Sequence, residues 1–124
     1  MKEQSQRQLR VAQQIRHEII RLLQHGGFTN PLLSDAASIT VTEVSMSPDL
    51  KNAKAYVVHL GDEDIAKDML AALNEVAPVL QGKIARELGL RATPRLRFDP
   101  DTSFKTASRL NDLLANLPPA SAQD

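Results

Sequence analysis

The stretch SITVTEVSMSPDLKNAKAYVVHL, residues 38–60, decides the fold because runs rich in β-branched residues flank a turn signal. These runs predict one strand over 38–46 and a second over 53–60. Ser47-Pro48-Asp49 suits the turn between them, since proline fixes φ at about −65°. The apolar residues of the first strand fall at odd positions at its start, Ile39 and Val41, and at even positions at its end, Val44 and Met46. One extra residue would bring both pairs to the same face, so we expect a β-bulge near Glu43.

A helix is predicted before this hairpin. Ser5 and Gln8 fit a capping box, in which each side chain satisfies a free backbone N–H of the other residue. Gly26-Gly27 ends the helix, and residues 28–37 are typical of a loop. The apolar stripe consists of Val11, Ile15, Ile19, Leu22 and Leu23.

Two helices are predicted after the hairpin. The acidic cluster Asp62-Glu63-Asp64 is expected to open the first, where negative charge meets the positive end of the helix dipole. Pro78 should break or kink the chain, because proline lacks the N–H of the helical ladder. The second helix is expected to end at Gly89. The apolar stripes are Ile65, Met69, Leu73 and Val76, then Val79, Leu80, Ile84 and Leu88.

Residues 95–98, Arg-Leu-Arg-Phe, predict a third strand with apolar and basic residues on opposite faces. Leu110, Leu113, Leu114 and Leu117 predict an extra C-terminal helix, and residues 118–124 are expected to be a disordered tail. The simplest packing of these elements is an α+β domain over residues 1–117, with a three-stranded sheet and helices on one face.

Composition narrows the class of protein. The chain has 124 residues, enough for one domain with a substantial core, and no cysteine, so a thiolate metal site or a disulfide framework is excluded. No apolar run reaches the length of a membrane span, and the polar start does not fit a signal peptide. Tyr56 and three phenylalanines are the only aromatic residues, which argues against a surface of stacking platforms. We therefore expect a cytoplasmic protein.

A net charge of zero conceals charged blocks. Residues 1–25 are basic and residues 61–68 are acidic. Residues 83–97 carry one acidic residue, Glu87, against five basic ones: Lys83, Arg86, Arg91, Arg95 and Arg97. Arginine forks match phosphate oxygens, so this block favours an anionic partner, although solvated surface charge remains an alternative.

Motifs for catalysis are absent. The sequence has no Gly-rich phosphate loop, no nucleophile elbow and no zinc-binding His pair of the H-E-x-x-H type. His17 and His25 are two helical turns apart, too far to share a metal ion. A small hydrolase would have only Asp62, Asp64 and His59 to use, and helix capping explains the carboxylates better. We expect neither an enzyme nor a cofactor or metal, nor a small-molecule substrate.

Several motifs together resemble the ribosome-binding factor A family. They are Arg10-Val11-Ala12-Gln13, Asn30-Pro31-Leu32, the run over 40–57 with Ser47-x-Asp49-Leu50 and Ala53-Lys54-x-Tyr56-Val57, and then Leu90-Arg91, Pro94-Arg95-Leu96, Asp101-Thr102-Ser103 and Arg109-Leu110. The resemblance covers residues 7 to about 114, and the strand-turn-strand run is its specific part.

The resemblance implies a KH-like domain of type II, with order αββααβ. It implies a monomeric assembly factor that binds the immature small (30S) ribosomal subunit and its rRNA near the 5′-terminal helix and the decoding region. It also implies a role in late rRNA processing that matters most in the cold. Val76-Ala77-Pro78 stands where the family has an Ala-x-Gly kink, so proline replaces glycine there.

The basic residues are the candidate RNA contacts: Arg7, Arg10, Lys83, Arg86, Arg91, Arg95 and Arg97. We favour the helix side, with Lys83, Arg86, Arg91 and Arg10, over the strand face of Arg95 and Arg97. A protein–protein adaptor whose basic face does not touch RNA is the alternative function.

Overall fold

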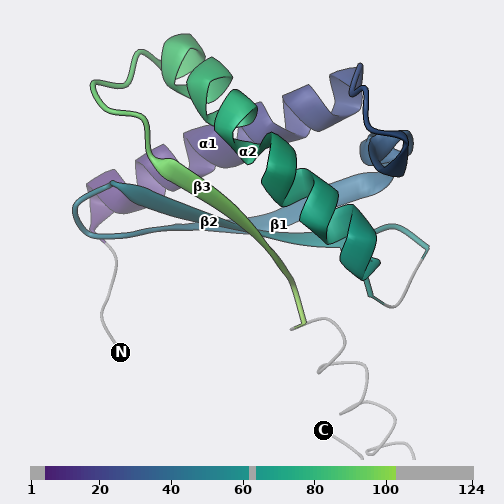
Figure 1. The fold of residues 1–124 in the computed structure, drawn as a ribbon. Helices are drawn as coiled ribbons and strands as arrows, with labels where there is room; N and C mark the ends of the chain where they lie inside the picture. The colour runs from purple at the N-terminus through teal and green to yellow at the C-terminus, as the bar shows by residue number, and fades with distance from the viewer. Residues whose placement is uncertain (1–4, 62–63, 103–124) are drawn as a thin grey trace, which may run out of the picture.

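The computed structural model describes residues 5–61 and 64–102, which form a three-stranded sheet with two helices on one face (Figure 1). In chain order the elements are α1 (Gln6–His25), β1 (Ile39–Met46), β2 (Asn52–His59), α2 (Lys67–Leu88) and β3 (Arg95–Pro100), with short 3-10 turns at Pro31–Leu33 and Ala36–Ser38. The predicted α+β class is confirmed. The helix expected over 110–117 and the tail 118–124 lie outside the described residues.

The central strand of the sheet is β2. It pairs antiparallel with β1 and parallel with β3. Val41 pairs with Val57 and Glu43 pairs with Tyr56, so Thr42 is an extra residue and the expected bulge is confirmed. The bulge allows apolar residues of both parities to face the core, namely Ile39, Val41, Val44 and Met46.

The predicted turn joins β1 to β2. The backbone N–H of Leu50 donates to the carbonyl of Ser47 over 2.9 Å, which closes the turn. Leu50 itself has φ 62°, a left-handed conformation that is uncommon for a residue with a Cβ. Its side chain packs partly buried against the core, which holds the backbone in this conformation.

The start of α1 is the predicted capping box. Ser5 Oγ accepts from the N–H of Gln8 at 3.1 Å, and Gln8 Oε1 accepts from the N–H of Ser5 at 2.9 Å. The buried Gln8 side chain also donates from Nε2 to the carbonyl of Met46, and Arg16 Nε donates to the carbonyl of Val41. Two side chains of α1 thus donate hydrogen bonds to backbone carbonyls of β1, one of the two edge strands.

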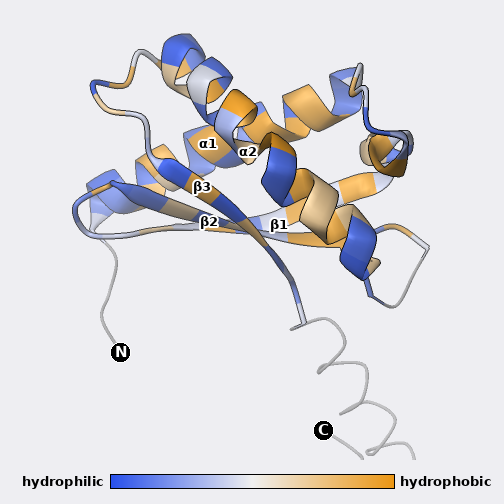
Figure 2. Ribbon diagram, in the orientation of Figure 1, coloured by the Kyte–Doolittle hydropathy of each residue, from blue (hydrophilic) through white to orange (hydrophobic). Residues whose placement is uncertain are grey.

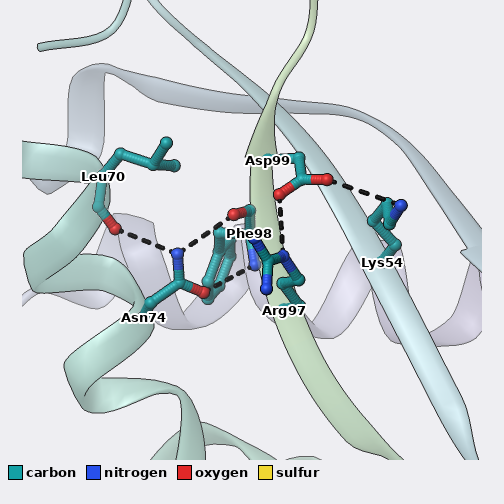
Figure 3. A network of polar contacts seen from close by, with 6 residues as sticks. All are labelled: Lys54, Leu70, Asn74, Arg97, Phe98 and Asp99. Atoms are coloured by element: carbon teal, nitrogen blue, oxygen red, sulfur yellow. Dashed lines mark hydrogen bonds and ion pairs between the residues drawn. The ribbon is translucent and has the colours of Figure 1, made fainter. Parts of the chain in front are cut away.

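The other edge strand, β3, is covered in the same way by α2. Asn74 accepts from the N–H of Phe98 at 2.8 Å and donates to its carbonyl at 3.0 Å (Figure 3). The N–H of Leu96 donates to Gln81 Oε1 at 2.8 Å. Pro100 has no N–H to offer, so the outward donors of β3 are already used or absent.

The second helical region differs from the sequence prediction in two ways. One continuous helix runs through Pro78 in place of two broken helices. The reason is the apolar stripe: Leu73 and Ala77 before the proline and Leu80 and Ile84 after it share a spacing of three or four residues and are all buried. Pro78 itself is exposed, so a locally missing hydrogen bond does not disturb this packing.

The start of this helix was also predicted too early. It begins at Lys67 with Ala66 as N-cap, and its only acidic residue in the first turn is Asp68. Ile65 is buried ahead of the helix, so its burial does not require helical geometry. Asp64 lies outside the first turn, and Asp62 and Glu63 are not described. Helix capping by the acidic cluster is therefore wrong for Asp64.

The core lies between the sheet and the helices. Phe98 of β3, Ile15 and Ile19 of α1 and Leu73 of α2 are almost completely inaccessible to solvent. The α1 helix packs mainly on β1, and α2 packs on β3. Hydrophilic and hydrophobic residues alternate along the strands (Figure 2). Because the buried residues of each strand face the helices, the opposite sheet face carries mostly polar side chains and is not covered by these helices. Neither described helix has the length and apolar character needed to cross a bilayer.

Candidate nucleic-acid interface

The uncovered face of the sheet carries three basic residues. Arg95 and Arg97 are exposed on β3, while Leu96 and Phe98 between and after them are buried, as the sequence predicts. Lys54 of β2 pairs directly with Arg97, so its side chain emerges on the same face. These three residues border a hollow of about 350 Å³ that Ser45, Asn52 and Tyr56 also line.

Asp99 holds two of these cations. Its Oδ1 accepts from Arg97 Nε at 3.0 Å, and its Oδ2 lies 3.5 Å from Lys54 Nζ (Figure 3). Like charges directly opposite each other on neighbouring strands repel, and a carboxylate between them offsets that repulsion. Arg95 is exposed and makes no ion pair within the described residues.

A second basic hollow lies at the end of the molecule where the β1–β2 turn is found. Arg7 of α1, Lys51 of the turn and Arg91 of the α2–β3 loop line its volume of about 480 Å³. Asp49 also lines it, and hydrogen bonds from the Ser47 hydroxyl and the Lys51 N–H lower the pKa of that carboxyl. The three cations come from segments distant in sequence.

The two hollows are lined by neighbouring segments of the chain. The N–H of Arg95 donates to the carbonyl of Lys51 at 2.8 Å, which ties the residue at the start of β3 to the turn. Chain neighbours line both hollows, since Ser47 borders one and Pro48 the other. We call the six cations around them the basic strip: Arg7, Lys51, Lys54, Arg91, Arg95 and Arg97.

The strip contains four of the seven predicted contact residues. Arg10 is exposed on α1, and Lys83 and Arg86 are exposed on α2, none of them lining either hollow. Lys51 and Lys54 were missed, because neither belongs to a basic block of the sequence. For Lys54 the alternation with Ala53 and Ala55 was the available signal, since it placed Lys54 on the polar face.

Negative charge gathers toward the opposite end of the sheet. Thr42 donates a hydrogen bond to Asp101, just past the end of β3, and Glu43 is exposed beside the bulge. Beyond the far end of β1, Asp35 Oδ2 lies 2.9 Å from His59 Nε2. The pKa of the Asp35 carboxyl is lowered by its hydrogen bonds from His59 and then Ser38. Among the described residues, the basic strip and these acidic side chains therefore lie toward opposite ends of the sheet.

Residues at the predicted kink do not form a binding feature of their own. Val76 is half-buried and Ala77 is buried, and Pro78 lies on the solvent side of α2. Within residues 5–61 and 64–102, no three His, Asp or Glu side chains are arranged to hold a metal ion.

The arrangement of one sheet and a single helical layer, with an uncovered basic face, defines a KH-like α+β domain. A family model described as "Ribosome-binding factor A" matches residues 7–114. Over 110 residues the chain is 48% identical to ribosome-binding factor A from Paramagnetospirillum magneticum and 46% identical to the one from Maricaulis maris. Each match covers 89% of this chain, and they cover 76% and 77% of the two relatives, respectively. The chain therefore belongs to the ribosome-binding factor A family, as its motifs predict.

Solved structures agree with this assignment. The crystal structure of ribosome-binding factor A from Thermus thermophilus matches with a TM-score of 0.59 and 26% identity, covering 75% of this chain and 94% of that one. A homology model of the Thermus thermophilus factor, fitted into a cryo-EM map of a 30S complex, matches with a TM-score of 0.59. At 22% identity over 77% of this chain and 96% of the other, this second likeness concerns the fold alone.

Proposed function

We propose that this protein is a ribosome assembly factor that binds the immature small ribosomal subunit and its rRNA. Family membership supports the proposal, and the relative fitted into a 30S complex shares the fold. The observation that carries it is the basic strip, since six cations from five segments of a chain with zero net charge line these two hollows. Such a concentration of charge is suited to phosphate.

The proposed action is binding without catalysis. The factor acts in the cytoplasm as a monomer, near the 5′-terminal helix and the decoding region of the small subunit, and assists late rRNA processing, above all in the cold. Its candidate contacts form two competing sets, only one of which need bind RNA: the basic strip, or the helix residues Arg10, Lys83 and Arg86. No step of this role requires a cofactor.

Sedimentation tests the proposal. Lysate is run through a sucrose gradient, and the protein should travel with free small subunits and be sparse on assembled ribosomes. Binding to purified small subunits should then weaken steeply with salt, because each phosphate contact releases counterions; a log–log slope of about −0.7 per contact is expected on single strands. Failure to travel with small subunits would refute the proposed function.

The adaptor alternative is tested in the same experiment. Binding is compared between naked small-subunit rRNA and intact subunits at equal salt. An RNA-binding factor retains salt-dependent affinity for the naked rRNA. A protein that binds intact subunits with little dependence on salt and ignores naked rRNA acts through ribosomal proteins, and the RNA part of the proposal is then wrong.

A further inference from the structure

We propose that the open face of the sheet holds the sugar–phosphate backbone of RNA, with Lys54, Arg95 and Arg97 as phosphate contacts and Asp99 as an internal competitor for two of them. This inference rests on the proposed function and specifies the surface that performs it. It departs from the helix side that the sequence favours.

The geometry of the face supports a polyanion as its occupant. Lys54 and Arg97 are paired across β2 and β3, and Arg95 lies two residues before Arg97 on the same face. The side chain of Arg97 is 71% exposed and that of Lys54 is 46% exposed. Three cations are therefore presented to solvent on a short stretch of two adjacent strands, beside a hollow that a phosphate group can enter.

The β3 edge of the sheet does not offer an alternative mode of binding. A peptide that extended the sheet would need free backbone groups on β3, but Asn74 and Gln81 already bond to Phe98 and Leu96. Gln8 and Arg16 likewise occupy carbonyls of β1. The side chains of the open face are therefore a better route of contact than the β3 edge.

Contact with phosphates fits this face better than stacking on bases. Tyr56 is the only aromatic residue bordering the hollow, and Phe98 points into the core with no exposed surface. One ring cannot support successive bases in the manner of a stacking platform. Arg95, adjacent to Lys51, continues the strip toward Arg7 and Arg91, so a strand of RNA can meet further cations beyond the sheet.

Asp99 competes with RNA phosphates for two cations of this face. Its carboxylate is hydrogen-bonded to Arg97 and paired with Lys54. An incoming phosphate must share these two cations with Asp99 and is repelled by its charge. Asp99 therefore lowers the affinity of the face for RNA, and its removal should strengthen binding.

The experiment compares Asp99→Asn with the unchanged protein and with Glu75→Gln. Glu75 is exposed on α2 and makes no ion pair within the described residues, so Glu75→Gln gives the same change in net charge away from the face. The probes are a fluorescein-labelled single-stranded RNA of about 20 nucleotides and purified small subunits. Thermal melts confirm that each variant is folded.

We expect Asp99→Asn to bind the RNA about three- to tenfold more tightly and Glu75→Gln to bind as the unchanged protein does. Charge reversal of Arg95 and Arg97 to Glu should weaken binding to both probes by about tenfold or more. The competing pair, Lys83→Glu with Arg86→Glu, should weaken binding by less than about twofold.

Several outcomes would overturn the inference. If Asp99→Asn and Glu75→Gln have equal effects, Asp99 is no competitor. If the Lys83 and Arg86 pair abolishes subunit binding while the Arg95 and Arg97 pair does not, RNA lies on the helix side and the proposed function stands. If the unchanged protein binds subunits but not the RNA, and reversal of Arg95 and Arg97 abolishes subunit binding, the face docks a protein. If the unchanged protein binds no subunits, the proposed function itself fails.

Discussion

The two faces of β3 serve different purposes although their residues alternate along one strand. Leu96 and Phe98 point toward the helices and are buried, with Phe98 having 0% exposed surface. Arg95 and Arg97 point the other way, and the Arg97 side chain is 71% exposed. Burial makes the first pair important for stability, whereas exposed charges contribute little to it. One strand can thus hold the domain together and present cations to a ligand, and the two roles should be separable by mutation.

Phe98→Ala is the strongest test of this separation. Removing a fully buried aromatic side chain leaves a cavity between β3 and the helices, and we expect a loss of about 3–5 kcal/mol in the free energy of unfolding. Its neighbour Arg97→Ala is the matched control and should change that free energy by less than about 0.5 kcal/mol. Urea denaturation followed by circular dichroism measures both. Comparable losses in the two variants would show that the open face also carries the fold.

Asn74→Ala tests a contact between α2 and the backbone of β3. The substitution removes both hydrogen bonds to Phe98 and leaves a partly buried N–H and carbonyl without their partner (Figure 3). We expect a loss of about 1–3 kcal/mol, smaller than that of Phe98→Ala. The control is Glu75→Ala, the next residue on the same helix, which is exposed and should be nearly neutral. Thermal melts measure both variants. If Asn74→Ala and Glu75→Ala have the same melting temperature, the Asn74 hydrogen bonds add nothing to stability.

The sequence was informative wherever a residue's neighbours in the chain determine its structure. The Ser5–Gln8 capping box, the bulge beside Glu43 and the opposite faces of Arg95 and Phe98 all follow from local spacing, and all are confirmed. Of the expected break or kink at Pro78, the break is wrong, because local propensity was weighed without the continuous apolar stripe that packs α2 on the sheet, while the kink stays a prediction. A proline on the solvent side costs one hydrogen bond and leaves that burial unchanged.

The candidate site was only partly predictable for a different reason. The strip combines residues from α1, the β1–β2 turn, β2, the α2–β3 loop and β3, so its assembly depends on which strands pair. The block of charge over 83–97 pointed to Arg91, Arg95 and Arg97, but Lys51 and Lys54 lie about 40 residues away in the chain. Parallel pairing of β2 with β3, which spacing alone does not reveal, is what places Lys54 beside Arg97. The hydrogen bonds of Asn74 to the backbone of Phe98 depend on the same kind of long-range packing, here of α2 on β3.

The smallest expected effect concerns the acidic end of the sheet, which should respond to pH. The Asp35 carboxyl is hydrogen-bonded to His59 and Ser38, and these bonds hold its pKa below the ordinary value. A carboxyl whose pKa is lower in the folded state stabilises the fold above its unfolded pKa, and this contribution is lost as the pH falls through the folded pKa. The stability advantage of the unchanged protein over Asp35→Asn should therefore be present above about pH 4 and shrink below it.

Thermal melts from pH 7 to pH 3 measure the stability difference between the two proteins, and carboxyl titration by NMR measures the pKa of Asp35. Ser38→Ala, which keeps the His59 contact, should raise the pKa of Asp35 only part of the way. A difference between the two proteins that stays constant down to pH 3 would show that the carboxylate charge at Asp35 has no part in stability.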